Sequence, residues 1–394
     1  MHLFNPWHDL ALAHFTPNYT PPASAVQMTK DLAVLPVWYA GGDTVIAEGT
    51  VNRMFVDERK EVLPVSSPLI SFPEIALHPQ EEVIPWGWNP ALRKQMLALG
   101  ATVSQVPTME ELQRLRGYAH RQHAVQLLGE LKAEEPGYCG ESYYFTRMEE
   151  LLDYLSSSPG DKVLKMPLSG SGKGLIWILG GITDKQADWC RRVMRQQGGV
   201  IAEPVLRKVQ DCAMEFYLDQ GAVRFAGYSL FHAATSGAYT GNALLSDRHI
   251  IEKLSLFYPA IGWQRLRDSL IPKLARLFPL YRGYAGVDMM ICEAGGGYAV
   301  QPCVEINMRM NMGMVARRFH DQFMETDAQG RFAVDYFRKP GDAWSFHRKM
   351  EQAYPLVVAD KRITSGYLPL TPVTADTRYT ACIVVDQSPG VGGR

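Results

Sequence analysis

The sequence predicts an α/β protein made of several lobes, on the basis of three observations. The chain has 394 residues, of which 46% are hydrophobic, so it is too long for one typical domain and can bury a sizeable core. Short apolar runs alternate with stretches whose apolar residues recur every three or four positions. Two pairs of apolar runs flank glycine-rich turns, which is typical of antiparallel hairpins.

Composition argues against several classes of partner. Forty Lys and Arg residues nearly balance 41 Asp and Glu residues, giving a net charge of −1. This balance does not suggest a nucleic-acid or membrane-surface partner, although a local basic pocket remains compatible with it. The six cysteines form no C-x-x-C pair, and no signal peptide or apolar run of 18 residues is present. We therefore expect a cytoplasmic protein with reduced thiols.

The first hundred residues predict a small α/β domain at 1–104. "DLAVLPVWYA" (31–40) and "DTVIAEG" (43–49) are typical of buried strands between proline-containing loops. "NPALRKQMLALGATV" predicts a helix that ends at Gly100 before another strand.

The rest of the chain alternates helices with paired strands. Amphipathic spacing predicts helices over 108–135, 147–160, 184–199 and 258–286, the last of which contains a proline. The strands expected here form hairpins over 161–181, 212–231 and 284–309, and further strands are expected at 199–206, 365–373 and 378–386.

The first hairpin contains a glycine loop, "VLKMPLSGSGKGLIWI" (163–178). It is not a P-loop, because Pro167 and Gly174 stand where that motif needs glycine and Ser or Thr, and "LIWIL" predicts a strand rather than a helix. A Rossmann turn fails for lack of a following helix. Glycines between strands let main-chain N–H groups approach phosphates, and Lys165 stands at the end of the incoming strand. An exposed loop with ordinary surface lysines explains this stretch alone equally well.

The hairpin at 284–309 supplies the second observation. Asp288 is expected opposite residues 303–305, while Glu305 and Asn307 share one face of their strand. Three oxygen ligands of this kind suit Mg²⁺, and Arg309 continues the same face. Acidic residues at strand ends are usually solvated, but several within apolar strands call for a metal or an ion-pair network.

Taken together, these motifs resemble the ATP-grasp superfamily. The glycine-loop hairpin with its lysine, then "IAEPVL", then a hairpin ending in "EINMRMNMG" follow the order of that family over residues 105–320. The resemblance implies a small N-terminal domain followed by two lobes around an antiparallel-sheet nucleotide cleft. The first lobe would span 105–202, and the second lobe, with a C-terminal extension, 203–394.

The resemblance also implies roles for single residues. Lys165 would bind ATP phosphates and act in catalysis with Arg309, which would stabilise the transferring group. The metal ligands, for Mg²⁺ or alternatively Mn²⁺, would be Asp288, Glu305 and Asn307. The remaining nucleotide contacts would come from Arg121 and from Ser169, Gly170, Ser171, Gly172, Gly174, Glu203 and Val205, with Asp211 or Glu215 reaching the ribose. Two departures from the family pattern are Pro204 in the hinge and Asp211 in place of a glutamate.

The activity implied is an ATP- and Mg²⁺-dependent ligase. A carboxylate would be activated as an acyl phosphate and attacked by an amine or a thiol. A kinase on the same fold and a non-catalytic nucleotide-binding regulator are the alternatives. Substrates would be small-molecule or peptide carboxylates and amines, and nothing in the sequence decides whether the protein is a homodimer, as similar proteins often are. "FNPWHDLALA" at residues 4–13 either contributes Asn5, His8 and Asp9 to a substrate pocket or caps a helix.

Overall fold

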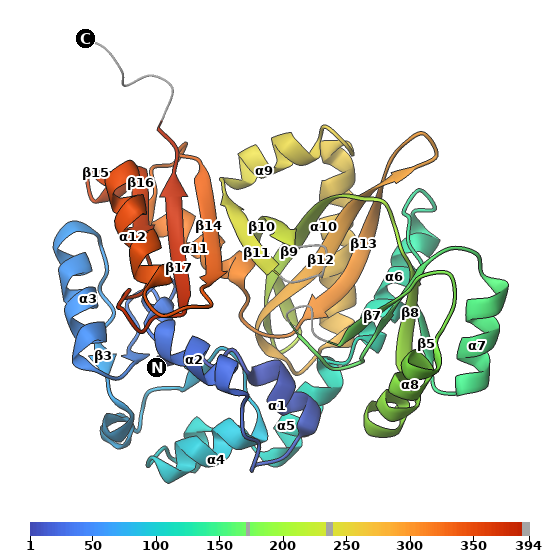
Figure 1. The fold of residues 1–394 in the computed structure, drawn as a ribbon, viewed down its shortest axis with the longest axis horizontal. Helices are drawn as coiled ribbons and strands as arrows, with labels where there is room; N and C mark the ends of the chain where they lie inside the picture. The colour runs from blue at the N-terminus through green and yellow to red at the C-terminus, as the bar shows by residue number, and fades with distance from the viewer. Residues whose placement is uncertain (171–173, 234–238, 388–394) are drawn as a thin grey trace. The chain divides into compact units, whose positions relative to one another are not determined.

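The computed structural model describes residues 1–170, 174–233 and 239–387. The chain divides into two compact units, each discontinuous in sequence (Figure 1). Unit 1 comprises Met1–Leu112, Thr240–Ile250 and Met310–Arg394, and unit 2 comprises Gln113–Tyr239 and Ile251–Arg309. The predicted domains, 1–104, 105–202 and 203–394, are continuous ranges, whereas these units each combine separate segments of the chain. The predicted domain boundaries therefore stay a prediction.

Unit 1 begins with a parallel sheet of strand order β3-β2-β1-β4. Its strands are β1 (His2–Leu3), β2 (Val45–Ile46), β3 (Leu69–Ile70) and β4 (Ile84–Pro85). The helices of this region are α1 (His8–His14), α2 (Ala23–Asp31), α3 (Thr50–Val62) and α4 (Pro90–Ala98), with 3₁₀ turns η1 (Leu35–Trp38), η2 (Phe72–Leu77) and η3 (Val103–Gln105). Asn89 caps α4 by accepting the Leu92 N–H at 3.0 Å, and Gly100 follows the helix with a φ of 90°.

The strand predicted over 31–40 is wrong. Asp31 ends α2, and Leu35 to Trp38 form the turn η1. Pro36 has no N–H to give to a sheet, whereas a 3₁₀ turn tolerates it. The run is apolar because the turn is buried, and the Trp38 indole N–H donates to the Leu370 carbonyl at 2.6 Å. A short buried turn and a buried strand have the same hydrophobic pattern. The strand expected after Gly100 is also absent, and η3 takes its place.

Unit 1 also contains an antiparallel sheet of order β11-β14-β17-β16-β15. These strands are β11 (Tyr239–Leu244), β14 (Gly330–Tyr336), β15 (Val357–Ala359), β16 (Arg362–Pro369) and β17 (Tyr379–Val385). Helices α11 (Met312–Phe323) and α12 (Asp342–Ala353) contact β16, and α9 (Asp247–Leu254) carries the chain from unit 1 into unit 2. The strands predicted at 365–373 and 378–386 are confirmed as β16 and β17.

Unit 2 contains a small antiparallel sheet of order β5-β8-β6-β7. Its strands are β5 (Tyr143–Phe145), β6 (Lys162–Lys165), β7 (Leu175–Ile178) and β8 (Val200–Pro204). Helices α7 (Met148–Ser157) and α8 (Asp184–Gln197) pack on it through a core that includes Leu151, Leu164 and Val193 (Figure 1). The predicted pairing of the strands that flank the glycine loop is confirmed as β6–β7.

The second sheet of unit 2 is made of long antiparallel strands in the order β13-β12-β9-β10. They are β9 (Lys208–Asp219), β10 (Ala222–Ala233), β12 (Arg282–Ala294) and β13 (Gly297–Asn307). Helix α6 (Gln122–Glu134) packs on β13 and α10 (Ala260–Leu277) on β10, and Arg276 of α10 binds Glu130 of α6 at 2.5 Å. The helix predicted over 108–135 is two helices, since α5 (Met109–Tyr118) ends before α6 begins.

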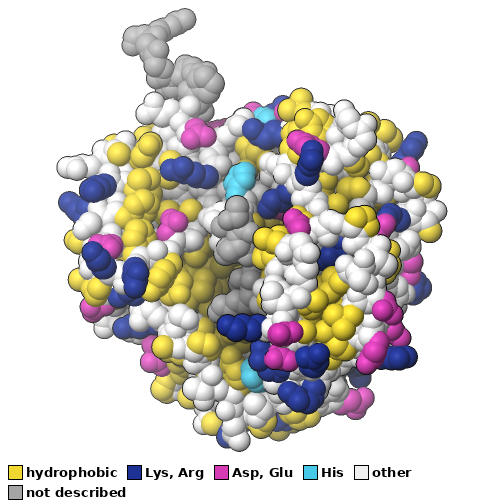
Figure 2. Space-filling view, turned by 45° about the vertical axis from the view of Figure 1, so that its right-hand side comes forward, with side chains coloured by type: hydrophobic (Ala, Val, Ile, Leu, Met, Phe, Trp, Pro, Cys, Tyr) yellow, Lys and Arg dark blue, Asp and Glu magenta, His cyan; other side chains and the backbone are white. Residues whose placement is uncertain are grey.

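Charge is distributed evenly on the surface in view. Figure 2 shows Lys and Arg interspersed with Asp and Glu, with no large area of one sign on the face drawn. Among the described residues, no helix is both long and apolar enough to cross a bilayer.

Candidate functional site

A buried ion pair joins two strands of the small sheet. Lys165 is the last residue of β6 and Glu203 lies on the neighbouring β8, where it pairs with Val163. The Lys165 ammonium and a Glu203 carboxylate oxygen are 2.6 Å apart, with side chains 8% and 7% exposed. Ser142 donates its hydroxyl to the other Glu203 oxygen at 2.9 Å. Burial of a charge is costly unless it is paired, so each residue here depends on the other.

The glycine loop begins next to this pair. The Met166 N–H donates to the Gly174 carbonyl at 2.8 Å and closes the base of the loop. Gly174 has a φ of 75°, and a Cβ there would stand 2.8 Å from the Ser169 Cβ. Glycine is therefore required at 174 both for its conformation and for space. Gly170 is buried, and the predicted site residues Ser171 and Gly172 lie outside the described residues.

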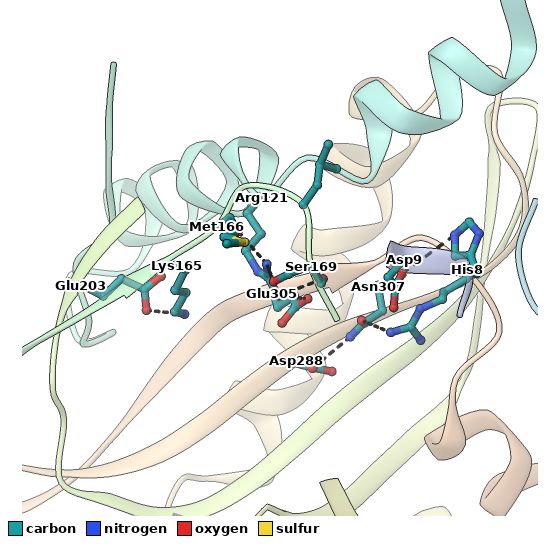
Figure 3. A network of polar contacts seen from close by, with 12 residues as sticks. His8, Asp9, Arg121, Lys165, Met166, Ser169, Glu203, Asp288, Glu305 and Asn307 are labelled. Atoms are coloured by element: carbon teal, nitrogen blue, oxygen red, sulfur yellow. Dashed lines mark hydrogen bonds and ion pairs between the residues drawn. The ribbon is translucent and has the colours of Figure 1, made fainter. Parts of the chain in front are cut away.

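Arg121 connects the loop to the second sheet of unit 2. It precedes α6 and is 6% exposed. Its guanidinium donates to the Met166 carbonyl at 2.7 Å, to the Ser169 hydroxyl at 2.6 Å and to the Ser169 carbonyl at 3.2 Å. It also binds a Glu305 carboxylate oxygen at 2.7 Å (Figure 3). One planar cation thus fixes the start of the loop relative to β13.

Four polar residues share one face of the second sheet. Asp288 of β12 pairs directly with Glu305 of β13. Gly286, two positions before Asp288 on β12, pairs with Asn307 of β13 on one side and with Glu215 of β9 on the other. Because directly opposed residues of antiparallel strands point to the same side, the side chains of Glu215, Asp288, Glu305 and Asn307 lie on one face. We call these four residues the acidic face.

The acidic face places like charges close together. Burial raises the pKa of Asp288 well above its ordinary value, and the charges of Glu305 and Glu215 raise it further. The Asn307 amide donates to an Asp288 oxygen at 3.0 Å (Figure 3). The Arg309 guanidinium donates to the Asn307 side-chain oxygen at 3.2 Å. This amide and the Arg309 charge lower that pKa, but less than burial and the carboxylates raise it.

The acidic face has the chemistry of a site for a hard divalent cation. Its donors are carboxylate and amide oxygens, which suit Mg²⁺ or Mn²⁺, and a cation between them would offset the repulsion that raises the Asp288 pKa. Among the described residues no group of three or more His, Cys, Asp or Glu is arranged to hold a metal by itself. Asp288, Glu305 and Asn307 therefore fit a cation that takes its remaining ligands from a bound phosphate or from water.

Two other predicted nucleotide contacts lie outside this network. Asp211 accepts from the Lys208 ammonium at 2.5 Å. Val205 is 39% exposed, and its N–H donates to the Asp161 carbonyl at 2.9 Å. Of its two main-chain polar groups, the carbonyl is therefore the one available to a ligand. Of the two alternatives for the ribose, Glu215 belongs to the acidic face and Asp211 is in an ion pair.

The "FNPWHDLALA" segment belongs to unit 1. Asn5 is 1% exposed, and its side chain donates to the Gly87 carbonyl at 2.8 Å and accepts the Gly87 N–H at 3.3 Å. His8 and Asp9 lie in the first turn of α1, and the His8 Nε2 and an Asp9 carboxylate oxygen are 3.9 Å apart. Asn5 therefore fastens the start of the chain to the segment after β4, which fits a structural role for the segment.

Sequence reasoning did not identify three of these contacts. It gave Glu203 a main-chain role, whereas its side chain holds Lys165. Ser142 and the Met166 carbonyl were not singled out, and they bind Glu203 and Arg121. The alternation of β6 and β8 could have placed Lys165 and Glu203 on one face, but only knowledge that these strands are neighbours brings them together. Nothing in the local sequence marks Ser142.

Comparisons with known proteins give structural similarity only. The sequence matches no protein-family model, and no curated protein matches it. The chain is similar to N5-carboxyaminoimidazole ribonucleotide synthetase in complex with ADP, with 14% identity, a TM-score of 0.48 and coverage of 88% of this chain and 93% of the other. Biotin carboxylase of Campylobacter jejuni in its β-γ-ATP complex has 11% identity and a TM-score of 0.49, with coverages of 98% and 87%. These values assign neither activity nor substrate.

Proposed function

We propose that this chain is an ATP- and Mg²⁺-dependent carboxylate–amine ligase of the ATP-grasp type. The observation that carries the proposal is the arrangement around Arg121, which ties a glycine loop to the partly buried acidic face in one compact unit. Lys165 stands at the base of that loop with its charge held by Glu203. A cation-lined loop beside clustered oxygen ligands suits a nucleotide triphosphate bound with a divalent metal.

In this proposal, each residue has a defined task. Lys165 offsets negative charge on the ATP phosphates, and the loop from Ser169 to Gly174 covers them with main-chain N–H groups. Asp288, Glu305 and Asn307 would hold Mg²⁺, which would supply charge neutralisation to the bound phosphates. Arg309 stabilises charge on the transferring phosphoryl group. Main-chain atoms of Glu203 and Val205 contact the adenine base, and Glu215 or Asp211 the ribose.

The reaction needs no covalent protein nucleophile. A carboxylate oxygen of the substrate attacks the γ-phosphorus of ATP, and the bond from that phosphorus to the bridging oxygen of ADP breaks. The amine then attacks the acyl carbon, loses a proton and displaces phosphate, leaving an amide. The chain's contribution is to position the groups, offset charge and exclude water under the loop.

The first test is the thermal midpoint of the protein with and without Mg·ATP. Ligand at 100 times its dissociation constant should stabilise the fold by about 2.7 kcal/mol. We expect a rise that requires Mg²⁺ in the wild type and shrinks in Lys165→Met and Glu305→Gln. The matched control is Lys185→Met, an exposed lysine on α8, which should keep the full rise. Absence of any rise at millimolar Mg·ATP would contradict the nucleotide site.

The second test separates the ligase from its alternatives. Carboxylate and amine pairs are screened for phosphate release, and the product of a positive pair is identified by mass spectrometry. An amide supports the ligase, and a phosphoester indicates a kinase. ATP binding without turnover over the whole screen would favour a binding role.

A further inference from the structure

A cavity in unit 1 is separate from the residues described above. Its volume is about 760 Å³, within the range of about 300–1,000 Å³ that small-molecule sites occupy. Every residue that lines it falls between Leu3 and Ala98, so it belongs wholly to the first part of unit 1. None of these residues belongs to the proposed nucleotide or metal site.

The cavity lies at one end of the parallel sheet. Phe4 directly follows β1, Ala47 and Glu48 directly follow β2, and Phe72 lies two residues after β3. All these strands run in the same direction, so their carboxyl ends meet at one edge. That edge is where open parallel sheets bind ligands.

The floor of the cavity is apolar and largely aromatic. Phe4 and Trp7 are buried, 1% and 8% exposed, as are Leu3 and Ile46. The Trp7 and Tyr19 rings are stacked with centroids 6.4 Å apart at an interplanar angle of 28°. An apolar floor that contains aromatic rings suits the apolar, planar part of a ligand.

Charged residues stand at the rim instead. Lys30 of α2, Lys94 of α4 and Glu48 are exposed and line the same cavity. Lys94 donates to the Asn18 side-chain oxygen at 2.7 Å, and one Glu48 oxygen accepts the Phe72 N–H at 3.1 Å. Two cations and one anion leave a single positive charge, which complements a monoanion better than a neutral or cationic ligand.

We propose that this cavity binds a planar aromatic carboxylate, with its ring on the floor and its carboxylate at Lys30 and Lys94. The proposal is independent of the nucleotide site, because no residue is shared. A ligand of this shape buries its apolar body and keeps its charged end near water, as the distribution of buried and exposed lining residues requires.

The test uses three probes that differ in one group: indole-3-acetate, the neutral tryptophol and the cationic tryptamine. Binding to the full chain is measured by isothermal titration calorimetry at pH 7.5. We expect indole-3-acetate to bind more tightly than tryptophol and tryptamine to bind most weakly. Removing each lysine as Lys30→Met or Lys94→Met should weaken indole-3-acetate by about two- to fivefold, the size expected of an exposed ion pair, and leave tryptophol unchanged.

Further variants locate the binding. Ala98→Phe, at an exposed lining position at the end of α4, should abolish binding of both indole-3-acetate and tryptophol. Lys349→Met, an exposed lysine of α12, and Lys165→Met should leave it unchanged, the latter even if Mg·ATP binding is lost. The proposal is overturned if no probe binds at millimolar concentration, if tryptamine binds as tightly as indole-3-acetate, or if Ala98→Phe has no effect.

Discussion

The two hairpins that define the candidate site treat charge in opposite ways. At β6–β7 the buried Lys165 is matched by Glu203 on the next strand, so the positive charge is offset within the protein. At β12–β13, Asp288 and Glu305 face each other with Glu215 nearby, and burial and repulsion raise the Asp288 pKa. The first hairpin is charge-balanced before any ligand arrives. At the second, Arg121 offsets Glu305, but Asp288 still faces like charges whose repulsion a cation would relieve.

Among the substitutions that test this difference, we expect the largest loss of folding stability at Glu203. Glu203→Gln leaves the Lys165 ammonium buried without a carboxylate, which should destabilise the fold by about 3–5 kcal/mol in urea unfolding. The double variant Lys165→Met with Glu203→Gln should recover much of that loss, because it leaves no unpaired charge. Asp188→Asn, which breaks an ion pair whose side chains are 57% and 72% exposed, is the control and should cost about 0–1 kcal/mol. Equal losses in Glu203→Gln and the control would show that the pair is not buried in solution.

The effect at Arg121 should be the next largest. Arg121→Lys keeps the charge but loses the planar fork that binds Met166, Ser169 and Glu305, for an expected cost of about 1–3 kcal/mol. Amide hydrogen exchange at residues 168–170 should accelerate in the variant. Arg147→Lys, in a side chain that is 66% exposed, serves as the control. Unchanged exchange would mean that Arg121 does not hold the loop.

Replacing Asp288 should stabilise the fold at neutral pH, whereas replacing Glu203 should destabilise it. Its pKa is raised on folding, so its contribution to stability is fully present below the ordinary value of 3.8 and is lost as the pH rises through the folded value. Asp288→Asn should therefore be more stable than the wild type at pH 8, with a gap that closes towards pH 4. The same variant should lose stabilisation by Mg·ATP. Asp219→Asn, with a side chain 52% exposed, should show neither behaviour.

The smallest effect concerns His120, next to Arg121. Burial, followed by the charge of His123, lowers the pKa of His120 from 6.5 to about 4. The unfolded chain takes up this proton below about pH 6.5 and the folded protein resists it, so the stabilising contribution is full above that pH and is lost as the pH falls towards 4. His120→Gln should flatten this part of the thermal-midpoint profile. An unchanged profile, or the same flattening in His14→Gln, would show that another group is responsible.

The sequence predicted the hairpins better than the contacts between them. The glycine-rich turn sets the register from Ala294–Gly297 to Met290–Gln301, and an irregularity beyond it brings Asp288 opposite Glu305, within the predicted range 303–305. Arg121 was predicted as a phosphate contact inside one long helix, since the helical spacing continues through the break before α6. The structure places it before α6 and against Met166 and Ser169, and the phosphate contact stays a prediction. Its bond to Glu305 joins residues 184 positions apart, and no local pattern encodes such a distance. The strand expected over 31–40 failed because buried turns and buried strands share a composition.

The irregular pairing of β12 and β13 has a consequence for deletions. Between the pairs Met290–Gln301 and Asp288–Glu305, the chain advances four positions on β13 but two on β12. β13 thus has two extra residues at this point. Because side chains alternate between the two faces of a strand, an even number of extra residues leaves Glu305 and Asn307 on the same face as Gln301. Removing one residue from 302–304 should send Glu305 and Asn307 to the opposite side of the sheet, while removing two should return them. We therefore expect a deletion of one residue to disrupt the acidic face and a deletion of two residues to preserve it.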